Sequence, residues 1–164
     1  LGEPEVFVFM GPLMVTASYY VQAKHFALAP LLASLPVGFL VTAILHANNM
    51  RDVVQDDERG RITWAVIACR SWGMSRGRKF SRWIYYGLLA GAYVTVIALI
   101  MEGTAPIFTI LTFLTIPQAY GLIRFVASGA EGKPLSRVVR GTAFLHMSFG
   151  ATFTIGYLLS ILLH

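Results

Sequence analysis

Apolar residues dominate five long stretches of the chain, and most polar residues lie between these stretches. Each stretch holds about 18 or more residues with almost no charge, close to the roughly 20 that cross a bilayer core as a helix. Backbone polar groups within lipid must be hydrogen-bonded internally, so the pattern predicts transmembrane α-helices. The predicted fold is an all-α, polytopic transmembrane bundle with spans at residues 6–23, 26–47, 83–101, 104–123 and 141–163.

Composition supports one membrane domain covering residues 1–164. Hydrophobic residues make up 56% of the chain and charged residues 13%, whereas soluble domains carry roughly 25% charged residues. Glycines and prolines within or beside the spans are tolerated in membrane helices and predict kinks rather than breaks. They are Gly11, Pro12, Pro30, Pro36, Gly38, Pro106 and Pro117.

The net charge of +5 could indicate nucleic-acid binding, but its distribution favours a membrane topology signal. Of the 13 Lys and Arg residues, all except Lys24 lie between the second and third spans or between the fourth and fifth. Basic loops stay in the cytoplasm, so we expect an integral, multi-pass protein that binds no nucleic acid. The segment 48–82 and the start of the chain are then cytoplasmic, and His164 lies on the opposite side.

A dense polar motif, residues 48–63, follows the second span. Because no Gly or Pro interrupts residues 45–59, the helix is predicted to continue through the motif. Asp52 and Asp56 would then share one face, with Asn48 one turn earlier. Two stacked carboxylates repel unless a cation lies between them, and Mg²⁺ commonly joins such carboxylates to substrate phosphates. A solvated helix end is the alternative interpretation. Gly60 is predicted to end the helix as a C′ residue.

The motif Asn-Asn-x-Arg-Asp-x-x-x-Asp-x-x-x-Gly-x-x-Thr resembles the second aspartate motif of the UbiA superfamily of membrane prenyltransferases. The nearest subgroup prenylates 1,4-dihydroxy-2-naphthoate or related precursors of menaquinone. Segments spread over nearly the whole chain carry the same resemblance. They are Leu1-Gly2-Glu3 with Gly11-Pro12, Tyr19–Gln22, Ala43–His46, Thr115-Ile116-Pro117, and Thr142–His146 with Phe149-Gly150.

The resemblance implies a site and a reaction. Asp52 and Asp56 would hold Mg²⁺, and a polyprenyl group would pass from a diphosphate to an aromatic naphthoquinone precursor at the membrane surface, in contact with lipid. The residues implied to bind the diphosphate or to position the carboxylates are Asn48, Asn49, Arg51, Arg61 and Thr63.

The five spans resemble the carboxy-terminal part of a nine-helix bundle, and the first motif of the family, Asn-Asp-x-x-Asp, does not occur in the 164 residues. Half of a metal site should not catalyse prenyl transfer alone. Three explanations stay open: an amino-terminal half outside the supplied sequence; a shortened, non-catalytic subunit of a membrane complex that binds quinone, isoprenoid, pigment or lipid; or a split enzyme completed by a membrane-protein partner.

Other residues have more than one interpretation. The basic segment from Arg70 to Lys79 is a topology signal that contacts anionic lipid, a contributor to diphosphate binding, or a protein-docking surface. His46 either faces a substrate cavity or packs between helices. His146 is expected to pack within the last span, and Cys69, the single cysteine, is expected to act as a small apolar filler.

Overall fold

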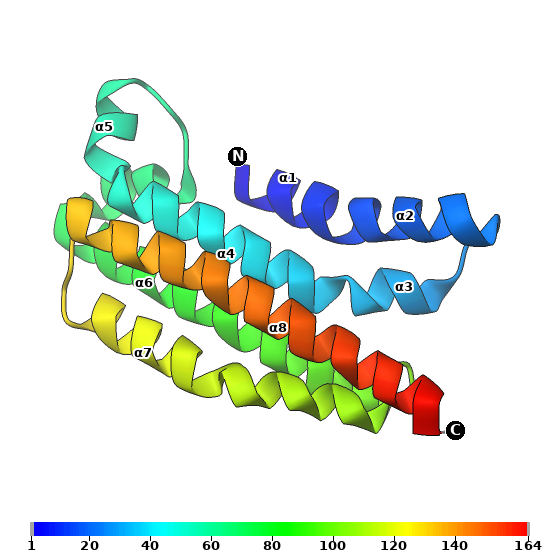
Figure 1. Ribbon diagram of the computed structural model, residues 1–164. Coiled ribbons are helices and arrows are strands. Elements are labelled where there is room, and N and C mark those ends of the chain that lie inside the picture. Colours follow the sequence, from blue (N-terminus) through cyan, green and yellow to red (C-terminus); the bar gives the residue numbers. More distant parts are fainter. Residues whose placement is uncertain (1, 164) are drawn as a thin grey trace.

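The computed structural model describes residues 2–163 and confirms the predicted all-helical bundle (Figure 1). Five helical segments are long and apolar enough to cross a membrane, as many as predicted, and each overlaps one predicted span. They cover Gly2–Ala23, Leu28–Arg51, Trp64–Met101, Ile107–Ala127 and Lys133–Leu163. The expectations for Leu1 and His164 lie outside the described residues.

Most of these spans consist of more than one helical element. The first contains α1 (Gly2–Val8), the π-helical turn η1 (Phe9–Leu13) and α2 (Met14–Ala23). The second contains α3 (Leu28–Ala33) and α4 (Leu35–Arg51), and the short helix α5 (Val53–Glu58) follows it. The third is α6 (Trp64–Met101), the fourth is η2 (Ile107–Thr115) with α7 (Ile116–Ala127), and the fifth is η3 (Lys133–Leu135) with α8 (Ser136–Leu163).

Prolines mark several of the internal junctions, as expected. Pro12 lies within η1, where a π turn accommodates a residue without an N–H group. Pro36 and Pro117 occupy the first turns of α4 and α7, where a helix needs no N–H donor from them. The chain therefore changes helical geometry at these prolines and continues across the span.

Helix α6 is much longer than its predicted span, because residues 64–82 are helical as well. Thr63 caps its first turn by accepting a hydrogen bond from the Val66 N–H (3.2 Å), and the helix then bends sharply at Gly73 (φ 76°, ψ 158°). A positive φ suits glycine, which has no Cβ. The apolar residues before Gly73 thus form a separate helical arm at the same end of the bundle as α5.

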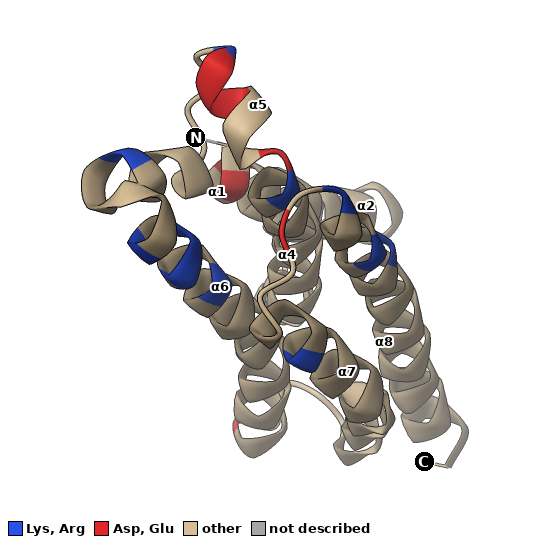
Figure 2. Cartoon of the chain, turned by 90° about the vertical axis from the view of Figure 1, so that its left-hand side faces the viewer, with Lys and Arg blue, Asp and Glu red and all other residues tan. Residues whose placement is uncertain are grey.

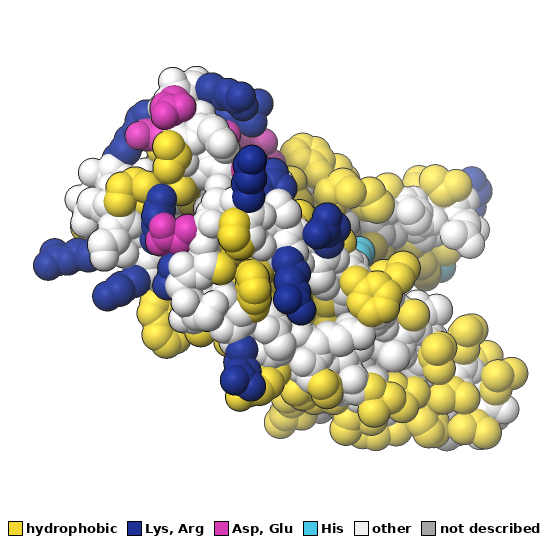
Figure 3. Space-filling view, turned by 60° about the vertical axis from the view of Figure 1, so that its left-hand side comes forward, with side chains coloured by type: hydrophobic (Ala, Val, Ile, Leu, Met, Phe, Trp, Pro, Cys, Tyr) yellow, Lys and Arg dark blue, Asp and Glu magenta, His cyan; other side chains and the backbone are white. Residues whose placement is uncertain are grey.

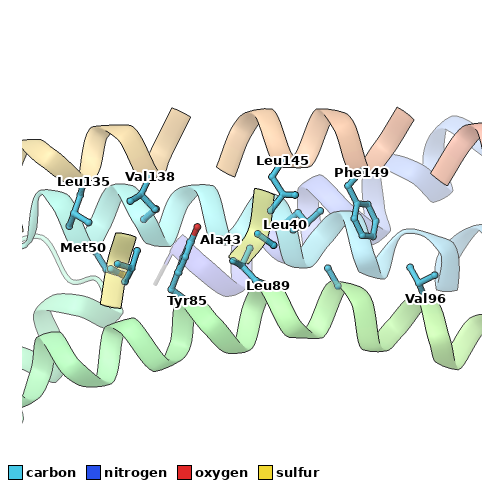
Figure 4. Packing of buried hydrophobic residues seen from close by; sticks show 14 of the residues in the cluster. Leu40, Ala43, Met50, Tyr85, Leu89, Val96, Leu135, Val138, Leu145 and Phe149 are labelled. Carbon is cyan, nitrogen blue, oxygen red and sulfur yellow. The ribbon is translucent and has the colours of Figure 1, made fainter. Parts of the chain in front are cut away.

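Helix α4 occupies the centre of the bundle and packs against α1, α6 and α8. Buried residues recur on these helices at intervals of three and four positions, the spacing of one helix face (Figure 4). The main core residues are Leu40, Ala43, Ala47 and Met50 on α4, Tyr85, Leu89, Ala92 and Val96 on α6, and Val138, Leu145 and Phe149 on α8. This packing fixes the end of α4, which leads into the aspartate motif.

Two glycines allow the first span to approach α4 closely. A Cβ atom built on Gly11 would lie 2.9 Å from the Cα atom of Gly38, closer than real Cβ contacts. The backbone on both sides leaves no flexible side chain that could move away.

Gly11→Ala should therefore lower the free energy of unfolding by about 1–3 kcal/mol, the usual cost of overpacking. Thermal unfolding of the purified protein in detergent would measure the loss. Gly87→Ala is the matched control, because a Cβ atom there meets nothing within 4 Å. Equal stability of the two variants would contradict the close approach.

Candidate functional site

Most charged residues lie at one end of the bundle, where α5, the start of α6 and the segment between α7 and α8 lie together (Figure 2). The space-filling view shows the same separation: Lys, Arg, Asp and Glu are concentrated towards that end, and hydrophobic side chains gather on the part of the visible surface far from it (Figure 3). The aspartate motif belongs to this charged end.

The prediction of an unbroken helix through the motif is wrong. Helix α4 ends at Arg51, and Asp52 leaves the helical region (φ −100°, ψ 11°) before α5 begins at Val53. Asn and Asp are poor helix formers because their side chains compete with backbone hydrogen bonds, and the Asp52 carboxylate here is held by Arg51. The Asp56 N–H still donates to the Asp52 carbonyl oxygen (2.8 Å), so the two aspartates remain one turn apart.

Gly60 ends α5 as predicted. It adopts a positive φ of 70°, its N–H donates to the Asp57 carbonyl oxygen (3.1 Å), and the Arg61 N–H donates to the Asp56 carbonyl oxygen (2.8 Å). These two bonds form a Schellman motif. This Schellman motif reverses the direction of the chain and places Arg61 beside Asp56.

Arg51 joins the first part of the motif into one cluster. Its Nε donates to Asp52 Oδ1 (2.7 Å), and its Nη2 donates to both Asp52 Oδ2 (2.5 Å) and Asn48 Oδ1 (2.7 Å). The hydrogen bonds from Arg51 lower the pKa of Asp52 below the usual carboxyl value, more strongly than partial burial raises it. Asp52 is therefore a carboxylate at neutral pH.

The second half of the motif is arranged differently. The Asp56 side chain is buried, and its Oδ1 lies 3.5 Å from Nη1 of Arg61, whose own side chain is 67% exposed. Thr63 caps α6, as described above. Asp52, Asn48 and Arg51 thus form one group, and Asp56 with Arg61 forms a second group one turn further on.

Asn49 points away from both groups. It is 6% exposed, and its Nδ2 donates to Oε1 of the fully buried Glu3 on α1 (2.9 Å). The same Oε1 atom lies 3.2 Å from Nδ1 of His46. The structure therefore places Asn49 in a helix-packing contact rather than beside Asp52. His46 packs between helices, the second of its two interpretations.

Sequence reasoning assigned no role to Glu3. A usable signal was present, because an ionisable residue at the start of an apolar span is costly unless it has a partner. Cys69 is buried and free, as expected, and His146 is partly buried within α8.

The oxygen donors of the motif are chemically suited to Mg²⁺. This ion prefers carboxylate oxygens and commonly takes only one or two of them, with substrate phosphates and water completing its shell. Asp52 and Asp56 would supply such a pair. Across residues 2–163, no three His, Cys, Asp or Glu side chains come together as a metal-holding group.

An apolar groove of about 410 Å³ lies beside the second half of the motif. It begins at Trp64, the residue after the Thr63 cap, and runs between the two halves of α6 on either side of Gly73. Its lining residues are Trp64, Ile67, Ala68, Ser71, Trp72, Phe80 and Ile84.

Comparison with known families settles the broad relationship. Residues 1–149 match the model of the UbiA prenyltransferase family. The chain belongs to the UbiA prenyltransferase family. This assignment agrees with the resemblance of the aspartate motif and with the helical bundle.

Curated relatives match almost the whole chain. The UbiA prenyltransferase domain-containing protein 1 of Mus musculus is 34% identical over 160 residues, which are 98% of this chain and 44% of that protein. Its Homo sapiens counterpart is 33% identical over 160 residues, 98% of this chain and 43% of that protein. The 1,4-dihydroxy-2-naphthoate octaprenyltransferase of Bacillus subtilis (strain 168) is 27% identical over 159 residues, 97% and 49% of the two chains. The chain thus spans less than half the length of these relatives. No solved structure gives a significant match.

The Arg51 contact makes a prediction about pH. Arg51→Met should raise the pKa of Asp52 toward the usual carboxyl value, because the variant removes its principal hydrogen-bond donor. Titration of ¹³C-labelled aspartate followed by NMR would measure this change. Arg70→Met is the control, since Arg70 pairs with Asp57 instead. An unmoved Asp52 titration in Arg51→Met would contradict the contact.

The sign of the linked stability change follows from the lowered pKa. The Arg51–Asp52 contact stabilises the folded state above the ordinary carboxyl pKa, and this contribution is lost as the pH falls through the lower, folded-state pKa. The acid-induced loss of stability should therefore be smaller in Arg51→Met.

Proposed function

We propose that this protein takes part in the transfer of a polyprenyl group from a diphosphate to an aromatic acceptor at the membrane surface. The observation that carries the proposal is the cluster of Asp52, Asn48 and Arg51 at the charged end of a bundle of the UbiA prenyltransferase family. Carboxylates, an amide and guanidinium donors together suit a metal–diphosphate group.

In this reaction the allylic C–O bond breaks, and its electron pair leaves with the diphosphate. The aromatic ring then forms a C–C bond to the allylic carbon and loses a proton. Arg51 has a direct role in this proposal: the N–H groups that hold Asp52 and Asn48 in the free protein also suit phosphate oxygens, which a guanidinium binds in a bidentate manner. Arg61, with its exposed side chain, would add a second positive charge beside the leaving group.

Asp52 and Asp56 are the proposed ligands for Mg²⁺. A Mg²⁺ ion held there would supply positive charge to the departing diphosphate. In our proposal Asn48 orients Arg51 through the hydrogen bond of its Oδ1 atom, and Thr63 fixes the start of the apolar groove by capping α6. The groove would accept part of the prenyl chain beside the motif.

A naphthoate-type acceptor is the finer part of the proposal. Its support is the 27% identity to the Bacillus subtilis 1,4-dihydroxy-2-naphthoate octaprenyltransferase together with the motif 48–63. Because the chain covers less than half of its relatives, we further propose that the opposing wall of the site comes from helices outside these 164 residues, in the same polypeptide or another.

A second candidate function is a non-catalytic membrane subunit that binds quinone, isoprenoid, pigment or lipid. The Arg51–Asp52 ion pair is compatible with this alternative as well, because the guanidinium by itself balances the charge of the carboxylate. In that case the polar cluster would be a stable helix end, and neither aspartate would affect turnover.

Single substitutions distinguish the two functions. Asp52→Asn and Asp56→Asn, introduced into the gene at its own locus, should each lower Mg²⁺-dependent prenyl transfer in isolated membranes by about a hundredfold or more, the scale expected when a principal electrostatic contact in the transition state is lost. Glu58→Gln is the control, because Glu58 is exposed on α5. Unchanged transfer in both aspartate variants would favour the non-catalytic subunit.

We also propose that the aspartate motif faces the cytoplasm, as the basic segments suggest. In a Cys69→Ala background, a cysteine at Glu58 should react with a membrane-impermeant reagent only after the membrane is opened. A cysteine at Lys24, at the opposite end of the first span, should react in intact cells. The reverse labelling pattern would contradict the proposed orientation.

A further inference from the structure

A buried polar network joins the first three spans beside Asp52, where α4 approaches its end. It contains Glu3 on α1, His46 and Asn49 on α4, and the backbone of Ser81 on α6. Glu3 and His46 are fully buried. Ionisable groups within a membrane span are costly, and they persist where they have partners and a role.

The hydrogen bonds of His46 constrain the charge of this network. Its Nε2 lies 3.0 Å from the Ser81 carbonyl oxygen, which can only accept, so Nε2 must carry a proton. Its Nδ1 faces Glu3 Oε1, which already accepts from Asn49. A neutral imidazole has one N–H group and cannot donate on both sides. With Nε2 protonated, the contact between Nδ1 and Oε1 holds one proton, carried either by the imidazole or by the carboxyl group.

The Glu3–His46 pair is neutral as a unit, which lowers the cost of placing both groups among apolar helices. The network differs from an ordinary packing contact because the single side chain of His46 joins three helices. His46 reaches α1 on one side and α6 on the other, and Asn49 adds a second bond to α1.

The network borders both ends of the segment that carries the aspartates. Asn49 lies three residues before Asp52, at the point where α4 ends. The His46 ring also contacts Trp64, the first residue of α6, with ring centroids 6.4 Å apart. Residues 52–63 are therefore held at their start by Asn49 and at their end by Trp64.

We propose that Glu3, His46 and Asn49 are positioning residues that set the rotation of α4 and thereby aim Asn48, Arg51 and Asp52. This inference rests on the proposed function and deepens it. Successive residues on a helix differ by about 100° in direction, so Asn49 can be fixed to Glu3 while Asn48 faces Arg51. The sequence motif thus contains one asparagine for the site and one for its support.

The test uses Glu3→Gln and Asn49→Ala, with Thr142→Val as the matched control. Thr142 forms an equally buried bond between helices, to the Tyr85 hydroxyl (2.7 Å), away from the motif. Spin labels on cysteines at Glu58 and Ser128, both exposed, report the position of α5 in a Cys69→Ala background. We expect a wider or shifted distance distribution in both network variants and an unchanged distribution in Thr142→Val.

Activity provides the second measurement. In isolated membranes, the network variants should lower kcat about tenfold or more, since small misplacements of reacting groups have effects of this size, while KM for the acceptor stays within about twofold. Thr142→Val should leave kcat within about twofold at a comparable loss of thermal stability. Network variants that match Thr142→Val in both measurements would overturn the positioning role.

If wild-type membranes show no prenyl transfer, the proposed function fails, and the spin-label distances still decide whether the network positions the motif.

Discussion

The packing of α4 against three other helices is the constraint on which the rest of the structure depends. Its apolar face is filled by small and branched residues that touch α6 and α8, and its opposite side is tied to α1 by Glu3. The end of α4 cannot rotate without disrupting its packing against α6 and α8 or breaking its hydrogen bond to Glu3. The direction of the aspartate motif is therefore decided by contacts at the end of α4, before Asp52 is reached.

The break at Asp52 shows how the polar end then departs from regular helix. Within lipid the backbone must keep its hydrogen bonds, and α4 does so as far as Arg51. At the charged end, water and side chains can replace backbone partners, and the Arg51 guanidinium binds Asp52 and Asn48. The motif thus forms a turn with its own side-chain structure, and the Schellman motif at Gly60 returns Arg61 to Asp56.

The sequence was sufficient for features that depend on composition or on a single special residue. The five spans follow from long apolar stretches, and the end of α5 follows from Gly60. The arm of α6 before Gly73 was missed because it lies between the charged aspartate motif and the basic residues 76–82, a context that resembles a loop, although Trp64–Cys69 are apolar and Thr63 can cap a helix. Asn48 and Asn49 were assigned alike because adjacent residues of one type look equivalent in a sequence. Their roles separate only when the burial of neighbouring Ala47 and Met50 fixes the helix face.

The interior and exterior of this protein are arranged as the membrane requires. Large apolar side chains such as Met101 and Leu162 are exposed, and lipid can surround them without penalty. Apolar contact with lipid is as favourable as contact with protein, so helices associate through close packing and hydrogen bonds instead. The buried bonds of Glu3 with Asn49 and of Tyr85 with Thr142 serve this purpose. Because the first of these bonds also borders the aspartate motif, the interactions that assemble the bundle and those that orient its polar site are in part the same.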